Sequence, residues 1–149
     1  MKRRSAMMVG WCMTLVFITA CGLGNSSLSS QPTEEQLLER VKEKIEKGTP
    51  VDTKDESGQT SLMWAAKMNS VSVAALLVEN GADVNARDSN GQTPLIYAAV
   101  NNSLKVAQLL IAAGADVDAR DNFTLTAILW AEVKRHDDMI SILRKHGAR

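Results

Sequence analysis

Side chains that could catalyse a reaction or bind a metal are few and poorly spaced in this sequence. His136 and His146 are ten positions apart and have no cysteine partner, which is not the spacing of a zinc site. Ser141 lies close to His136 and Asp137 within one short predicted helix, without the turn that presents a nucleophile. No glycine-rich phosphate loop is present. We therefore expect no catalytic residue, no metal and no cofactor, and a protein that is not an enzyme.

Cys21 has the surroundings of a lipid attachment site. Basic residues at positions 2–4 precede an uncharged run over residues 6–20, which is the layout of a cleaved export signal. The string Ile18-Thr19-Ala20-Cys21 resembles the lipobox of bacterial lipoproteins, in which the cysteine is acylated, as with palmitate, and becomes the first residue. The resemblance implies removal of residues 1–20 and lipidation of Cys21. An ordinary secretory signal with an incidental thiol is the alternative.

The segment after the cysteine predicts a tether and a location. Residues 22–32 read GLGNSSLSSQP, a composition typical of a flexible linker. In enteric bacteria an Asp at the second mature position retains lipoproteins at the inner membrane, so Gly22 implies the outer membrane. We expect a chain that is lipid-anchored to the bacterial envelope and faces the periplasm.

The charge of the mature chain argues against nucleic acid as a partner. Removal of residues 1–20 takes away three basic residues and no acid, so 14 of the 17 basic residues remain against 17 acidic ones, a net charge of −3. Nucleic-acid binding needs a basic face that neutralises phosphates. We therefore expect no nucleic-acid partner.

The elements that must position any binding residue follow a period of 33. The string Gly58-Gln59-Thr60 returns as Gly91-Gln92-Thr93, and Gly81-Ala82-Asp83-Val84 returns as Gly114-Ala115-Asp116-Val117. This period, with the string Thr93-Pro94-Leu95 at a helix start, resembles the ankyrin repeat. The resemblance implies an all-α solenoid over residues 33–149, with one N-terminal capping half repeat and three helix-turn-helix repeats.

Local signals place the helix ends. Thr60, Thr93 and Thr126 are expected to cap the first helix of each repeat. Gly81 and Gly114 are expected to end the second helices with a left-handed backbone. The half repeat is expected to begin with a capping box of Thr33 and Gln36 and to run to about Lys47, with Leu38, Val41 and Ile45 on one side.

The third repeat departs most from the pattern. Thr124 stands where Gly58 and Gly91 stand, and Ala127 replaces Pro94, so its turn is expected to differ. Glu132 replaces the small Ala66 and Ala99 of the earlier copies, which predicts that no repeat stacks beyond it.

Two surfaces are candidates for partner binding. Trp64, Tyr97 and Trp130 recur with the period of 33, opposite the apolar face of their helices, and the resemblance places them in a concave groove framed by Lys67. The alternative is that these aromatic side chains merely pack on one another and cover the helices.

The loop tips are the second surface. Phe123 and Leu125 are apolar where the second repeat has Asn90 and Gln92, which indicates either a contact surface or local repacking. Arg87 and Arg120 adjoin Asp88 and Asp121, so they are either contacts for a partner or, as we favour, loop salt bridges.

We hypothesise that the protein is a membrane-tethered module. It is expected to be a monomer when free and to hold one protein partner in its concave face and loop tips. Its sharper form is an immunity protein that neutralises a periplasm-acting toxin, such as a lipase or phospholipase delivered by type VI secretion. The alternative is an accessory lipoprotein that supports an envelope complex or protects a periplasmic enzyme.

Overall fold

A computed structural model describes residues 33–148, and the expected signal, Cys21 and tether lie outside this range. The described part contains seven helices and no strand. The helices are α1 (Glu34–Glu46), α2 (Ser61–Lys67), α3 (Val71–Glu79), α4 (Pro94–Val100), α5 (Leu104–Ala112), α6 (Ala127–Lys134) and α7 (Asp137–Lys145). None of the described helices is both long enough and apolar enough to span a bilayer.

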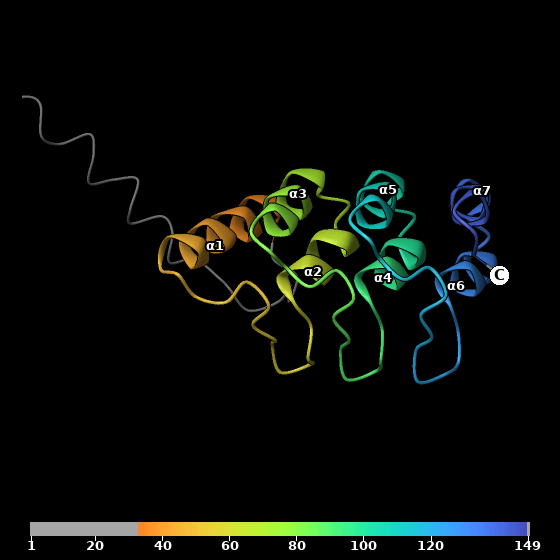
Figure 1. Cartoon of the computed structure of the whole chain (residues 1–149), viewed down its shortest axis with the longest axis horizontal. Helices are drawn as coiled ribbons and strands as arrows, with labels where there is room; N and C mark the ends of the chain where they lie inside the picture. Colours follow the sequence, from red (N-terminus) through yellow and green to blue (C-terminus); the bar gives the residue numbers. More distant parts are fainter. Residues whose placement is uncertain (1–32, 149) are drawn as a thin grey trace, which may run out of the picture. The chain divides into compact units, whose positions relative to one another are not determined.

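The helices of residues 33–148 form two rows. Figure 1 shows α2, α4 and α6 in one row and α1, α3, α5 and α7 in the other, with three loops extending on the side of the first row. Each first-row helix packs on the next, and α1 contacts both α2 and α3. Because α1 occupies the place of a second helix, the predicted half repeat followed by three full repeats is confirmed.

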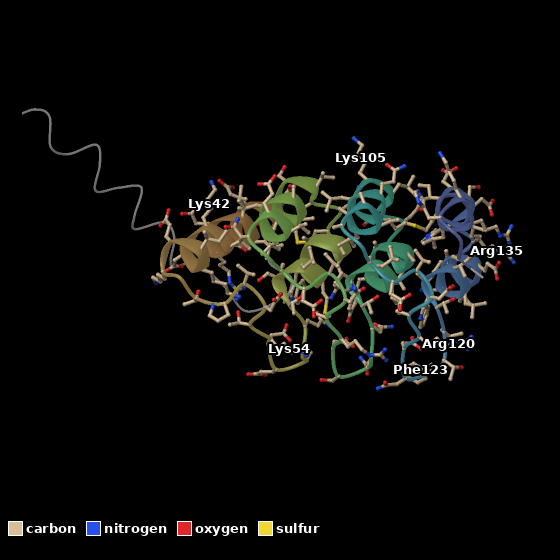
Figure 2. All side chains as sticks on the ribbon, viewed as in Figure 1. Lys42, Lys54, Lys105, Arg120, Phe123 and Arg135 are labelled. Carbon is tan, nitrogen blue, oxygen red and sulfur yellow. The ribbon has the colours of Figure 1, made fainter. Side chains whose placement is uncertain are left out.

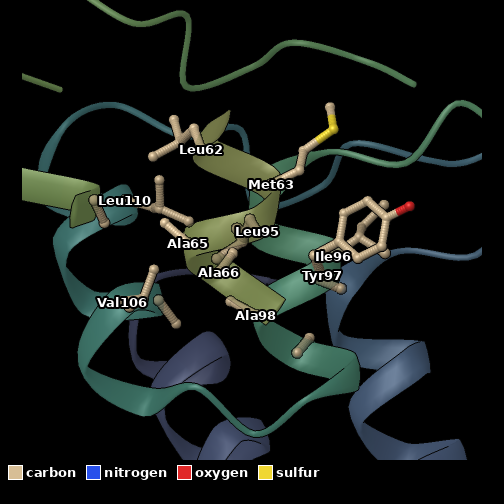
Figure 3. Packing of buried hydrophobic residues seen from close by; sticks show 14 of the residues in the cluster. Leu62, Met63, Ala65, Ala66, Leu95, Ile96, Tyr97, Ala98, Val106 and Leu110 are labelled. Atoms are coloured by element: carbon tan, nitrogen blue, oxygen red, sulfur yellow. The ribbon is translucent and has the colours of Figure 1, made fainter. Parts of the chain in front are cut away.

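Small residues between large apolar ones let the repeats approach closely. Ala65, Ala66, Ala98 and Ala99 are fully buried, and Leu62, Leu95 and Leu110 fill the space around them (Figure 3). A helix pair alone would leave one of these faces in water, so burial depends on the next repeat. In the half repeat Val41 is buried and Leu38 and Ile45 pack against the core as predicted, and Leu37 is buried as well.

The first helix of each repeat begins directly after its threonine, but only two of the three threonine side chains make a capping hydrogen bond. The capping box of Thr33 and Gln36 is present, and the hydroxyls of Thr60 and Thr93 accept the backbone N–H groups of Met63 and Ile96, each at 3.4 Å. The prediction for Thr126 was wrong, because its buried hydroxyl oxygen makes no hydrogen bond. The bonds in the first two copies are already long, so a small shift of the third loop is enough to lose the contact.

The turn of the third loop survives the loss of its glycine. Thr124 adopts φ +66°, close to φ +75° at Gly58 and φ +74° at Gly91. A Cβ atom at Gly91 would lie 2.4 Å from the Asn122 side chain of the next loop. In the described part no further loop stacks on Thr124, which explains why a larger residue fits there. The left-handed helix ends expected at Gly81 and Gly114 are confirmed, with φ +82° and +91°.

Candidate protein-binding surface

An aspartate anchors each of the three loops to the first helix of its own repeat. In Asp55, Asp88 and Asp121, Oδ1 accepts the backbone N–H groups of the residues two and four positions later. Each Oδ2 accepts a hydrogen bond from the aromatic residue nine positions later: Trp64 at 3.2 Å, Tyr97 at 2.7 Å and Trp130 at 2.8 Å. The polar atoms of all three aromatic side chains therefore already have partners within the chain.

The three aromatic residues are not equally accessible. Trp64 and Trp130 are half-buried, whereas Tyr97 is only 8% exposed. Gln59 of the preceding loop donates a hydrogen bond to the Tyr97 hydroxyl at 2.9 Å. Partner binding by these aromatic residues stays a prediction, and Tyr97 offers little surface for it.

Lys67 lies on these rings. Its ammonium nitrogen is 4.0 Å from the Trp64 ring centroid and 5.6 Å from that of Tyr97. At these distances the positive charge is attracted by the π faces of both rings. Lys67 therefore links the aromatic residues of the first and second repeats, and its role in partner binding stays a prediction.

The hydrogen bonds of the loops shift the pKa values of their ionisable groups. Burial alone would raise the pKa of Asp55, but hydrogen bonds from Gln59, Trp64 and Ser57 and the charge of Lys67 hold it below the ordinary value of 3.8. Burial likewise acts to raise the pKa of Asp121, but hydrogen bonds from Trp130 and the loop backbone outweigh it and lower that pKa. Burial, together with the hydrogen bond to Asp88 and its charge, raises the pKa of Tyr97.

Basic side chains connect one loop to the next. Lys54 Nζ donates to the Arg87 carbonyl at 2.8 Å, and Arg87 Nη2 donates to the Arg120 carbonyl at 2.7 Å. The expected salt bridges of Arg87 and Arg120 with the neighbouring aspartates are therefore wrong. The ion pairs of residues 33–148 are those of Lys47 with Glu43 and Arg144 with Glu132. The aspartate oxygens are already occupied by N–H and O–H donors, so the arginine is left to reach across to the next loop.

Backbone bonds complete the row of loops. The N–H of Ser89 donates to the Ser57 carbonyl at 3.2 Å, and the N–H of Asn122 donates to the Asn90 carbonyl at 2.9 Å. The three loops therefore form a continuous row whose tips bear exposed side chains, with Lys54, Arg120 and Phe123 labelled in Figure 2.

The sequence profile of ankyrin repeats (three copies) matches residues 29–121 and 87–149, which together cover most of the chain. The chain belongs to the ankyrin-repeat family. Comparison with curated proteins finds no match. Ankyrin repeats are protein–protein interaction modules and are typically not catalytic, so this ankyrin-repeat chain is a protein-binding module.

His136, Ser103 and Ser141 make hydrogen bonds to backbone carbonyls of the ankyrin-repeat stack. His136 Nδ1 lies 2.9 Å from the Ala99 carbonyl, the same link that Ser103 makes to the Ala66 carbonyl one repeat earlier. Ser141 donates to the Asp137 carbonyl within α7, so the three residues do not assemble a triad. Over residues 33–148 no group of three or more His, Cys, Asp and Glu side chains is placed to hold a metal ion.

Large exposed apolar side chains of the described part all belong to the third ankyrin repeat. Phe123 is 66% exposed and Val133 is 65% exposed, while Leu129 is 37% exposed. Phe123 was among the predicted contact residues, and its neighbour Leu125 is half-buried. Sequence reasoning missed Leu129 and Val133. The signal was available, because Leu129 aligns with the fully buried Met63 and Ile96 but follows the last loop.

Proposed function

We propose that this ankyrin-repeat chain is exported, anchored by a lipid on Cys21, and binds one protein partner in the periplasm as an inhibitor. In its specific form it is an immunity protein that neutralises a toxin acting there, such as a type VI secretion lipase or phospholipase. A tether at the membrane would keep such an inhibitor beside the lipids at risk.

The row of stacked loops is the observation that carries the binding role. Lys54 and Arg87 tie each loop to the next through backbone carbonyls, and backbone bonds at Ser89 and Asn122 fix the tips. A row of tips held in advance in one conformation loses little conformational entropy on binding. This arrangement suits an inhibitor, which must hold its target tightly.

The lipid anchor is proposed from the string Ile18-Thr19-Ala20-Cys21. Each buried acyl CH₂ group contributes about 0.8 kcal/mol, so more than one chain gives stable attachment. We expect wild-type protein to incorporate a palmitate analogue and to sediment with membranes, and Cys21→Ser to lose both properties. Cys12→Ser is the matched control and should leave both unchanged. Membrane-bound, labelled Cys21→Ser protein would overturn the anchor.

Inhibition is tested with the full-length chain carrying an affinity tag inserted between Ser27 and Leu28, purified from detergent-solubilised membranes of its own host. We expect one stoichiometric partner, encoded beside this chain, that is toxic when exported alone and harmless when the chain is co-produced. A non-toxic partner that belongs to an envelope assembly would replace the inhibitor role with the accessory one.

A further inference from the structure

The end of the stack formed by the third repeat differs from every internal junction. Met63 and Ile96 are fully buried at the junctions that follow the first and second repeats. Leu129, the equivalent residue of α6, is 37% exposed, and Val133 one turn later is 65% exposed. In the described part no helix pair stacks beyond the third repeat, so α6 has apolar side chains in the position where the earlier repeats contact a neighbour.

Within the described part, the last loop also lacks the side-chain link that each of the two earlier loops makes to the following loop. Lys54 and Arg87 each donate to a carbonyl of the following loop, but the guanidinium of Arg120 has no hydrogen bond or ion pair within residues 33–148. Phe123 is exposed on the tip of this loop (Figure 2). A donor that bonds an oxygen in both earlier loops is therefore available to an oxygen of another molecule.

An ion pair between exposed side chains covers part of this end of the stack. Glu132 and Arg144 form an ion pair at 3.1 Å that joins α6 to α7. A salt bridge between two exposed side chains contributes little stability, but it places polar groups across the part of α6 where a further repeat would need a small residue. The end is therefore shaped for a different contact from that of another stacked repeat.

We propose that Arg120, Phe123, Leu129 and Val133, here called the end face, are the main contact for the protein partner. This inference rests on the proposed function. The partner it fits is acidic, with apolar side chains that cover Phe123, Leu129 and Val133 beside a carboxylate that accepts hydrogen bonds from Arg120.

Charge supports an acidic partner. Arg120, Lys134 and Arg135 are exposed and take part in neither of the ion pairs of the described part. Figure 2 shows Arg135 at the same end of the stack as Arg120. A partner carboxylate that lies beside any one of these cations gains charge-assisted hydrogen bonds and faster association.

A second copy of this chain fits the end face less well. Three partly exposed apolar side chains offer on the order of 300 Å², whereas a stable interface buries roughly 800 Å² per partner. A symmetric pair would also bring Arg120, Lys134 and Arg135 of one copy near the same cations of the other. An acidic partner extends over the loop row as well and has no such repulsion.

The test uses the partner purified with the full-length chain, and measures its affinity for single variants by calorimetry. Phe123→Ser, Val133→Ser and Arg120→Ala should each weaken binding about tenfold or more. The matched control is Lys105→Ala, which removes an exposed cation of α5 in the other row of helices and should bind as wild type. The end-face side chains are exposed, so thermal melting should confirm that the variants stay folded.

Other outcomes separate the alternatives. If the end-face variants bind as wild type while Lys67→Ala loses affinity, the groove is the site and the end face is overturned, although the proposed function stands. If the partner-free chain sediments as a dimer that Phe123→Ser converts to a monomer, the occupant is a second copy and the inference fails. If no partner co-purifies, the proposed function and this inference fail together.

Discussion

At the scale of single residues, Tyr97 shows how one position can serve the fold rather than a partner. Its hydroxyl receives a hydrogen bond from Gln59 of the preceding loop and donates one to Asp88 of its own loop. The Tyr97 oxygen of α4 is therefore hydrogen-bonded both to the loop of the preceding repeat and to the loop of its own repeat. Trp64 and Trp130 donate to their loops but are less covered.

Tyr97→Phe removes this oxygen and leaves the buried Asp88 without its hydroxyl donor. We expect the free energy of unfolding in urea to fall by about 1–3 kcal/mol. The tyrosine pKa is raised in the folded state, so its stabilisation is complete below its ordinary pKa of 10 and is lost as the pH rises through the folded value. Tyr97→Phe should therefore lose less stability above pH 10 than wild type does. If the variant and wild type lose the same free energy of unfolding above pH 10, this role of Tyr97 is contradicted.

Acid should weaken the loops through their aspartates. The pKa values of Asp55 and Asp121 are lowered from 3.8 by hydrogen bonds that outweigh burial, so their stabilisation is complete above that value and is lost as the pH falls through the folded pKa. We expect the free energy of unfolding to fall below about pH 4. Asp121→Asn should flatten this dependence, as measured by urea unfolding at a series of pH values. If the free energy of unfolding depends on pH in the variant as it does in wild type, groups other than Asp121 cause the acid sensitivity.

At the scale of elements, the period of 33 was enough to predict the helices but not their surroundings. The repeated strings placed the half repeat, the three helix pairs and the glycine turns, because these depend on local backbone preferences. The period assigned the same role to Trp64 and Tyr97, yet only Tyr97 is buried. The hydrogen bond from Gln59 to the Tyr97 hydroxyl crosses a repeat junction, and no local pattern reports such a contact. The path of Arg87 to the Arg120 carbonyl was missed for the same reason.

Stacking between loops should make one glycine far more sensitive than another. A Cβ atom at Gly91 would lie 2.4 Å from Asn122 and 2.7 Å from Arg87, whereas at Gly114 nothing lies within 4 Å. Both have positive φ, which costs a side chain roughly 1–2 kcal/mol. Gly91→Ala should lose about 2–5 kcal/mol of unfolding free energy, because overpacking adds to that cost. Gly114→Ala is the matched control, and equal losses in urea unfolding would contradict loop stacking.

At the scale of the whole molecule, stability and binding have the same origin. Each repeat of this stack contacts only its neighbours, so α4 is covered on both sides by α2 and α6, while α6 has a single first-row neighbour among residues 33–148. The sequence predicted this linear organisation, with α6 in the last of the described repeats. It did not predict that apolar side chains remain exposed at that end. Their exposure depends on whether a neighbouring repeat covers them in space, and a repeat pattern describes only the positions that recur.

Amide hydrogen exchange of the full-length chain, with and without its co-purified partner, tests the central claim that this stack is a protein-binding module with its main contact at the third repeat. We expect slower exchange on binding in the loop over residues 118–125 and in α6, with α1 unchanged. Complex formation that leaves these segments unaltered and protects only α1 to α3 would contradict it.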